Sequence, residues 1–91
     1  MVKTNTEFAP PKAIFGEFEK KDDLKIVISL QEYRGSEYLD FRENWKPDDQ
    51  PDFRPTKKGF TFSVEEPELA VQAIDKMIAA LEKAKKHILA E

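Results

Sequence analysis

Apolar and polar residues alternate most regularly in the segment 24–33. The apolar positions of this segment are Leu24, Ile26, Ile28 and Leu30. A period of two with β-branched residues is typical of a strand that buries one face. The segments 13–20 and 37–45 are rich in aromatic residues, and we expect a strand in each. A fourth strand is predicted within 54–62, around its last four residues.

The segments between these strands carry residues that favour turns and loops. Arg34-Gly35-Ser36 predicts a tight turn, because Gly35 can take a positive φ, and it joins two strands into a hairpin. The segment 46–53 has two prolines and three aspartates and predicts a loop. Gly16 is a candidate β-bulge within the first strand.

The last part of the chain has a helical pattern from about residue 66 to 89. Its apolar residues recur every three or four positions: Ala70, Ala73, Ile74, Met77, Ile78, Leu81, Ala84 and Ile88. Ser63 followed by Glu66 predicts a capping box, with Pro67 in the first or second turn. Such a helix is about 36 Å long, more than a small sheet needs as cover. We therefore expect helix-to-helix contact with a second subunit, through Ile74, Met77, Ile78 and Leu81.

Four strands followed by one helix predict an α+β fold in a chain of 91 residues, which is short enough for one domain. We expect residues 1–12 to be a flexible tail, since they lack apolar periodicity and end in two prolines, and residues 13–91 to form the domain.

Composition narrows the classes of function. The chain has no cysteine, which excludes disulfides, thiolate metal sites and cysteine nucleophiles. His87 is the one histidine, and Asp48-Asp49 is best explained as a solvated charge pair, so we expect no enzyme, metal site or cofactor. Neither a membrane span nor a signal peptide is indicated, and we expect an intracellular protein. The net charge of −3 argues mildly against nucleic-acid binding.

Several aromatic residues nevertheless stand beside cations. Tyr33 precedes Arg34, and Arg42 lies three residues before Trp45. Further cations precede the fourth strand: Arg54, Lys57 and Lys58. Proteins that bind single-stranded nucleic acid combine cations, which follow the phosphates, with ring faces that stack on bases. Trp45 is equally well explained as a core residue, and paired lysines are often only solvated.

The run KIVISLQEYRGSEYLDFRENW and the later run RPTKKGFTFS resemble the core domain of the transcriptional coactivator family called positive cofactor four. The most specific elements are Tyr33-Arg34-Gly35, the segment from Asp40 to Trp45, and Pro55 to Gly59. The resemblance implies a curved antiparallel four-stranded sheet followed by a helix. It also implies dimerisation through the helices and sequence-tolerant binding of single-stranded DNA in transcription, replication or repair.

The resemblance also implies roles for matching positions. Tyr33 matches an aromatic residue of the family's hairpin that stacks on bases. Arg42 and Trp45 match the arginine and the tryptophan on the floor of the channel that holds the DNA strand. The matching cations are Arg34, Arg54, Lys57 and Lys58. The family often has a lysine where this chain has Ser36 and an aromatic where it has Asn44. The serine-rich regulatory segments of eukaryotic members are absent, which favours a bacterial or phage member, located in the cytoplasm with the nucleoid; a eukaryotic member would be nuclear.

Strict alternation along a strand puts Arg42 and Trp45 on opposite faces. We therefore predict a bulge or curl near Glu43–Asn44, which would let both line one channel. Two other functions stay open: a module that contacts proteins of the transcription machinery, suggested by the net negative charge, and an RNA-binding variant, because stacking accepts either sugar.

Overall fold

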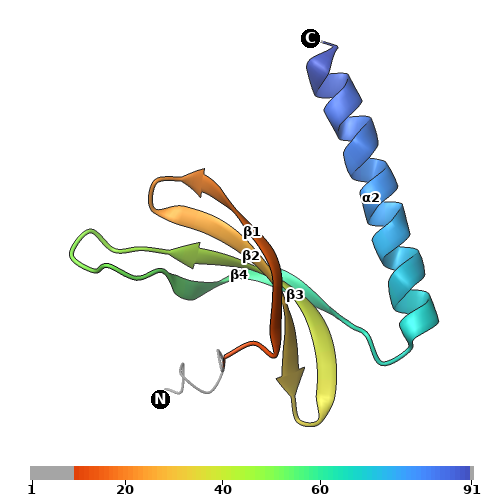
Figure 1. Cartoon of the computed structure of the whole chain (residues 1–91), viewed down its shortest axis with the longest axis horizontal. Helices are drawn as coiled ribbons and strands as arrows, with labels where there is room; N and C mark the ends of the chain where they lie inside the picture. Colours follow the sequence, from red (N-terminus) through yellow and green to blue (C-terminus); the bar gives the residue numbers. More distant parts are fainter. Residues whose placement is uncertain (1–9, 91) are drawn as a thin grey trace.

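The computed structural model describes residues 10–90. It contains four strands, β1 (Ala13–Lys21), β2 (Leu24–Tyr33), β3 (Ser36–Trp45) and β4 (Arg54–Ser63), followed by the helix α2 (Pro67–Leu89) (Figure 1). The predicted order of elements is confirmed. The fourth strand is longer than expected, since it begins at Arg54. Positions 1–9 of the predicted tail lie outside the described residues, and the backbone N–H of Lys12 already donates to the carbonyl of Leu30 at 2.8 Å.

The strands form one antiparallel sheet in the order β1-β2-β3-β4, so each strand pairs with its neighbours in sequence. The hairpin between β2 and β3 turns at Arg34 and Gly35, whose φ angles are 54° and 84°. Positive φ at both positions matches the twist of a two-residue hairpin, which explains the glycine that the sequence places there.

Three irregularities interrupt the pairing of the strands, and two of them lie in β1, at Gly16 and between Glu19 and Lys21. Phe15 is an extra residue of β1 opposite β2, next to Gly16, where a bulge was predicted. The pairing of β3 with β4 also shifts, because Arg42 is opposite Gly59 whereas Asn44 is opposite Pro55. The extra residues of this third irregularity therefore lie in β4.

The sheet has two chemically different faces. The apolar face carries Phe18, Ile26, Ile28, Leu30, Leu39, Phe41, Phe60 and Phe62, which are matched across the strands by the register. The polar face carries the alternate positions of β2 and β3, including Lys25, Ser29, Gln31, Asp40, Arg42 and Asn44. On the apolar face the rings of Phe41 and Phe60 stack with centroids 4.6 Å apart.

The helix begins later than the predicted capping box implies. Glu66 is the N-cap residue and makes no side-chain capping bond, and Pro67 is the first helical residue. Ser63 is still part of β4, and its Oγ accepts a hydrogen bond from the backbone N–H of Glu65 at 3.1 Å. The predicted cap at Ser63 is therefore wrong, while the position of Pro67, where its missing N–H costs least, is confirmed.

The helix stands beside the sheet and extends well beyond it (Figure 1). The radius of gyration is 15.2 Å, against about 12 Å for a compact chain of this length. Among residues 10–90, the buried apolar side chains are Leu39 and Ala70. Within the same residues, no helix is long and apolar enough to cross a membrane.

Candidate nucleic-acid interface

The polar face of the sheet is hollowed. The hollow has a volume of about 660 Å³ and is lined by residues of all four strands and by Phe53 of the β3–β4 loop. Its chemically important lining residues are Lys25, Tyr33, Tyr38, Asp40, Arg42, Asn44 and Phe53. Rings, amides and cations thus share one open surface, which suits a ligand that offers both flat rings and charged groups.

Arg42 is fixed on the floor of the hollow by Asp40. Asp40 is 4% exposed, and its carboxylate accepts from Arg42 Nη2 at 2.7 Å and from Nε at 3.4 Å. Arg42 Nη1 also donates to the carbonyl of Thr56 at 3.4 Å. Two contacts to one carboxylate hold the planar guanidinium in a single orientation, which prepares it for directional hydrogen bonds.

Tyr33 lies at one end of the hollow, where β2 enters the hairpin. Its side chain is 56% exposed, and the Arg34 guanidinium carbon is 5.1 Å from the centre of its ring. The ring therefore presents area to solvent beside a cation, as predicted for a stacking residue.

Trp45 is not part of the hollow. The register between β2 and β3 is unbroken from Tyr33–Ser36 to Leu24–Trp45, so Arg42 and Trp45 lie on opposite faces. An irregularity exists at the predicted place, between Arg42 and Asn44, but its extra residues belong to β4 and do not turn Trp45. The expectation that Arg42 and Trp45 line one channel is therefore wrong. Trp45 is 45% exposed on the apolar side, opposite Arg54.

The remaining predicted cations lie along β4. Lys57 and Lys58 are exposed in the stretch where β4 has its extra residues, and Lys58 donates its backbone N–H to Thr56 Oγ1 at 3.1 Å. Arg54 is exposed and hydrogen-bonds the side chain of Gln50. These cations and Arg34 are outside the lining of the hollow, so the predicted residues that the structure places in the hollow are Tyr33 and Arg42. Arg34 lies over the Tyr33 ring.

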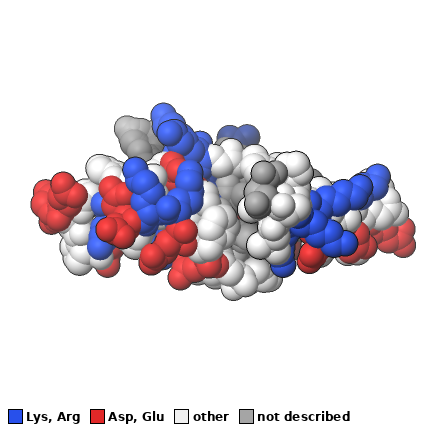
Figure 2. Space-filling model, turned by 90° about the horizontal axis from the view of Figure 1, so that it is seen from above, with Lys and Arg blue, Asp and Glu red and all other residues white. Residues whose placement is uncertain are grey.

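Cations and carboxylates are interleaved on the surface. Figure 2 shows Lys and Arg beside Asp and Glu, without one continuous basic band. Lys25 at the hollow pairs with Glu17 at 2.9 Å. At the edge of the sheet, Lys12 pairs with Glu37 and Glu32, and the hydrogen bond to Glu37 is the main cause of a raised Lys12 pKa.

One carboxylate lies within the apolar face. Glu43 is 8% exposed and accepts from Lys20 Nζ at 2.9 Å, and this hydrogen bond lowers the Glu43 pKa. Among residues 10–90, no group of three or more His, Cys, Asp and Glu side chains is placed to hold a metal ion.

The site includes residues that were not predicted from the sequence, among them Phe53, Lys25, Lys46 and Asp40. Phe53 lies beside two ammonium groups, with Lys25 Nζ 4.5 Å and Lys46 Nζ 5.7 Å from the centre of its ring. A signal was available for Phe53, since it is the one aromatic residue in the acidic loop 46–53. Asp40 was singled out only as part of a motif, and its buried position beneath Arg42 follows from alternation along β3.

Comparison with models of protein families matches residues 20–68 to the family described as transcriptional coactivator p15 (PC4). No curated protein and no solved structure matches the chain significantly. The matched segment is 49 of the 91 residues and includes β2, β3 and β4, which supply most of the lining of the hollow. The match agrees with the family that the sequence motifs resemble. The chain belongs to the PC4 family of transcriptional coactivators.

Proposed function

We propose that this chain binds single-stranded DNA in the hollow of its polar face and acts as a homodimer in transcription, at the nucleoid or in the nucleus. Membership of the PC4 family supports a DNA-binding coactivator. The observation that carries the single-strand proposal is that one open hollow is lined both by an exposed ring, Tyr33, and by a fixed guanidinium, Arg42. Stacking needs an unpaired base, which a duplex does not offer.

Tyr33 and Arg42 have different chemical roles in the proposed binding. Tyr33 supplies a ring face, and stacking of one base is worth about 1–3 kcal/mol. The charge of Arg42 is offset by its ion pair with Asp40, so the oriented guanidinium suits directional contact with a base edge or one phosphate oxygen rather than broad charge attraction. Arg34, Lys57 and Lys58 are exposed and supply phosphate contacts at the margins of the sheet. Trp45 with Arg54 would form a separate stacking position on the other face.

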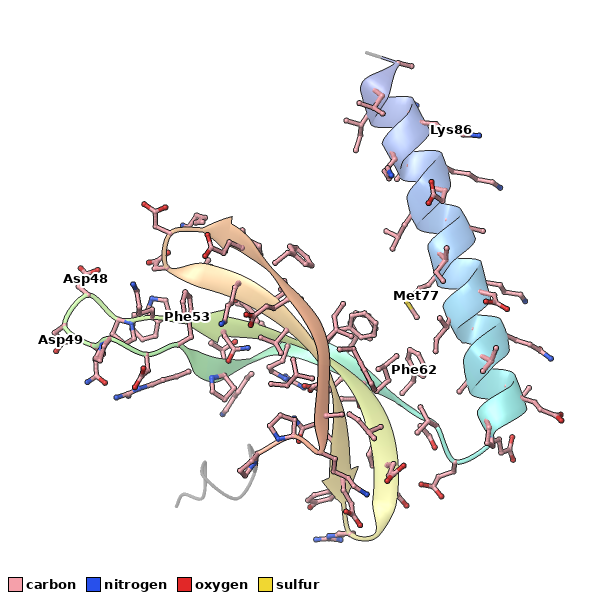
Figure 3. The ribbon with its side chains drawn as sticks, viewed as in Figure 1. Asp48, Asp49, Phe53, Phe62, Met77 and Lys86 are labelled. Atoms are coloured by element: carbon pink, nitrogen blue, oxygen red, sulfur yellow. The ribbon has the colours of Figure 1, made fainter. Side chains whose placement is uncertain are left out.

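The homodimer is supported by the apolar surface that one chain leaves exposed. On α2, Ile78 and Leu81 are 53% and 62% exposed, and on the sheet Phe18 and Phe60 are 56% and 55% exposed. Met77 projects from the side of α2 that faces the sheet, whereas Lys86 projects from the opposite side (Figure 3). Large apolar side chains exposed on both elements are typical of an interface, and a second copy with the same exposed side chains would cover them symmetrically.

The test is fluorescence anisotropy with a labelled mixed-sequence oligonucleotide of about 20 nucleotides, as a single strand and as the matched duplex. Preference for the single strand is expected, with a log–log salt slope of roughly −3 to −4 if four to six cations engage phosphates at about −0.7 each. A slope near zero would contradict the phosphate contacts. Equal binding of the duplex would contradict the stacking proposal, and an RNA strand of the same sequence decides between the two sugars.

A second function is favoured by the β3–β4 loop. Asp48 and Asp49 lie at the tip of this loop, away from the rest of the sheet (Figure 3), and both are exposed. An acidic tip suits a basic protein surface of the transcription machinery. This proposal expects a partner that survives nuclease treatment in a pull-down and is lost with Asp48→Asn/Asp49→Asn. Retention of the partner by that variant would contradict it.

A further inference from the structure

We infer that Phe53, together with Lys25 and Lys46, forms a second base-stacking position at the end of the hollow opposite to Tyr33. The inference rests on the proposed single-strand binding and adds residues to that site. Phe53 lies where the acidic loop joins β4, whereas Asp48 and Asp49 lie at the loop tip (Figure 3).

The surroundings of Phe53 resemble those of a binding ring more than those of a core ring. Phe53 lines the hollow and is partly exposed, and two ammonium groups lie 4.5 Å and 5.7 Å from its ring centre. Both ammonium groups lie over the ring, so a base stacks on Phe53 when they move off its face toward the flanking phosphates. Lys25 Nζ also forms an ion pair with Glu17 at 2.9 Å. Lys46 is the first residue after β3.

The two ends of the hollow are suitably separated. Lys25 and Tyr33 belong to the same face of β2 and are eight residues apart. At about 3.3 Å per residue the distance along the strand is roughly 26 Å. Arg42 lies between the two ends, because it pairs with Val27 of β2. A strand of at least about four nucleotides, the lower end of known site sizes, would cross the whole hollow from one ring to the other.

The simplest alternative is that Phe53 only anchors the loop through its apolar bulk. Leucine keeps most of that bulk but has no ring face, whereas tyrosine keeps the ring. Phe53→Leu and Phe53→Tyr therefore separate stacking from anchoring. Phe15→Leu is a matched control, because Phe15 is 63% exposed and lies outside the hollow.

The experiment measures the affinity of each variant for a labelled thymidine oligomer of 12 nucleotides, with circular dichroism to confirm the fold. Phe53→Leu should weaken binding at least about five-fold, and Phe53→Tyr and Phe15→Leu should bind as the wild type does. Lys46→Gln should make the log–log salt slope shallower by about 0.7. Tyr33→Leu is measured in parallel as the reference for the proposed site.

The outcomes separate this inference from the proposed function. If Tyr33→Leu weakens binding and Phe53→Leu does not, the second stacking position is wrong and single-strand binding stands. If Phe53→Tyr binds as weakly as Phe53→Leu, the ring is not stacking and the inference fails. If the wild-type protein does not bind the oligomer, the proposed function itself fails.

Discussion

The two faces of the sheet are built from the same strands. They differ in how many of their side chains find partners or burial within one chain. On the polar face, Asp40 holds Arg42, and Gln31 donates from Nε2 to Ser29 Oγ at 3.3 Å. On the apolar face and the helix, large side chains such as Phe60 and Leu81 stay exposed. The polar face is thus organised within one chain, whereas the apolar face and α2 leave large apolar side chains exposed, which the proposed homodimer would cover. Assembly and ligand binding should therefore be separable by mutation.

The largest effect on assembly and stability is expected when charged residues replace exposed apolar side chains of α2. Ile78→Glu/Leu81→Glu should convert a dimer into a monomer and destabilise it by about 3–6 kcal/mol per subunit, the cost of exposing two large apolar side chains. Sedimentation equilibrium and urea unfolding measure the two effects. Lys86→Gln, on the side of α2 that points away from the sheet, is the control and should stay dimeric. If the wild-type protein is a monomer at all concentrations, the proposed homodimer is wrong.

The next effect concerns the polar face. Asp40→Ala leaves the Arg42 guanidinium without its buried carboxylate, and removing one partner of a buried ion pair costs about 3–5 kcal/mol. Asp40→Asn should lose less, because the amide oxygen still accepts a hydrogen bond. Urea unfolding gives the loss, and sedimentation should show that the association of subunits is retained. A loss below about 0.5 kcal/mol for Asp40→Ala, the size of an ordinary surface substitution, would show that the pair does not organise this face.

A smaller effect compares one aromatic on each face. Tyr33→Ala should cost about 1–3 kcal/mol of binding free energy for single-stranded DNA. Trp45→Ala should cost less in binding than Tyr33→Ala if the strand stays within the hollow, because Trp45 is on the other face. Anisotropy titrations of both variants measure the difference. A larger loss at Trp45 would show that DNA crosses onto the apolar side, and equal unfolding curves would confirm that neither variant acts through stability.

These comparisons also show what the sequence could reveal. The alternation of apolar residues predicted both ends of β2 correctly, because a strand with one buried face shows a clear period of two. It also specified that Arg42 and Trp45 lie on different faces, and the prediction of a bulge in β3 that would reunite them was wrong. The extra residues were placed in β4 instead, next to Gly59, where a Cβ would lie 2.1 Å from the carbonyl oxygen of Phe41.

Other parts of the site depend on long-range placement that no local pattern carries. Phe53 reaches the hollow because the β3–β4 loop folds back beside Lys25, 28 positions earlier in the chain. The capping box at Ser63 failed for a related reason. The backbone N–H of Val64 donates to the carbonyl of Glu37 at 3.1 Å, so pairing with β3 extends past Ser63 and delays the helix.

The smallest effect concerns the carboxylate set into the apolar face. The hydrogen bond from Lys20 keeps the Glu43 pKa below the ordinary value of a glutamate side chain. A carboxyl whose folded pKa is lowered stabilises the protein above the unfolded pKa, and this contribution is lost as the pH falls through the folded pKa. The difference in free energy of unfolding between wild type and Glu43→Gln should therefore be present at neutral pH and shrink as the pH is lowered below about 4. Urea unfolding at a series of pH values measures it, and Lys20→Met should reduce the same pH dependence. A difference that does not change with pH would show that Glu43 acts by packing rather than by its charge.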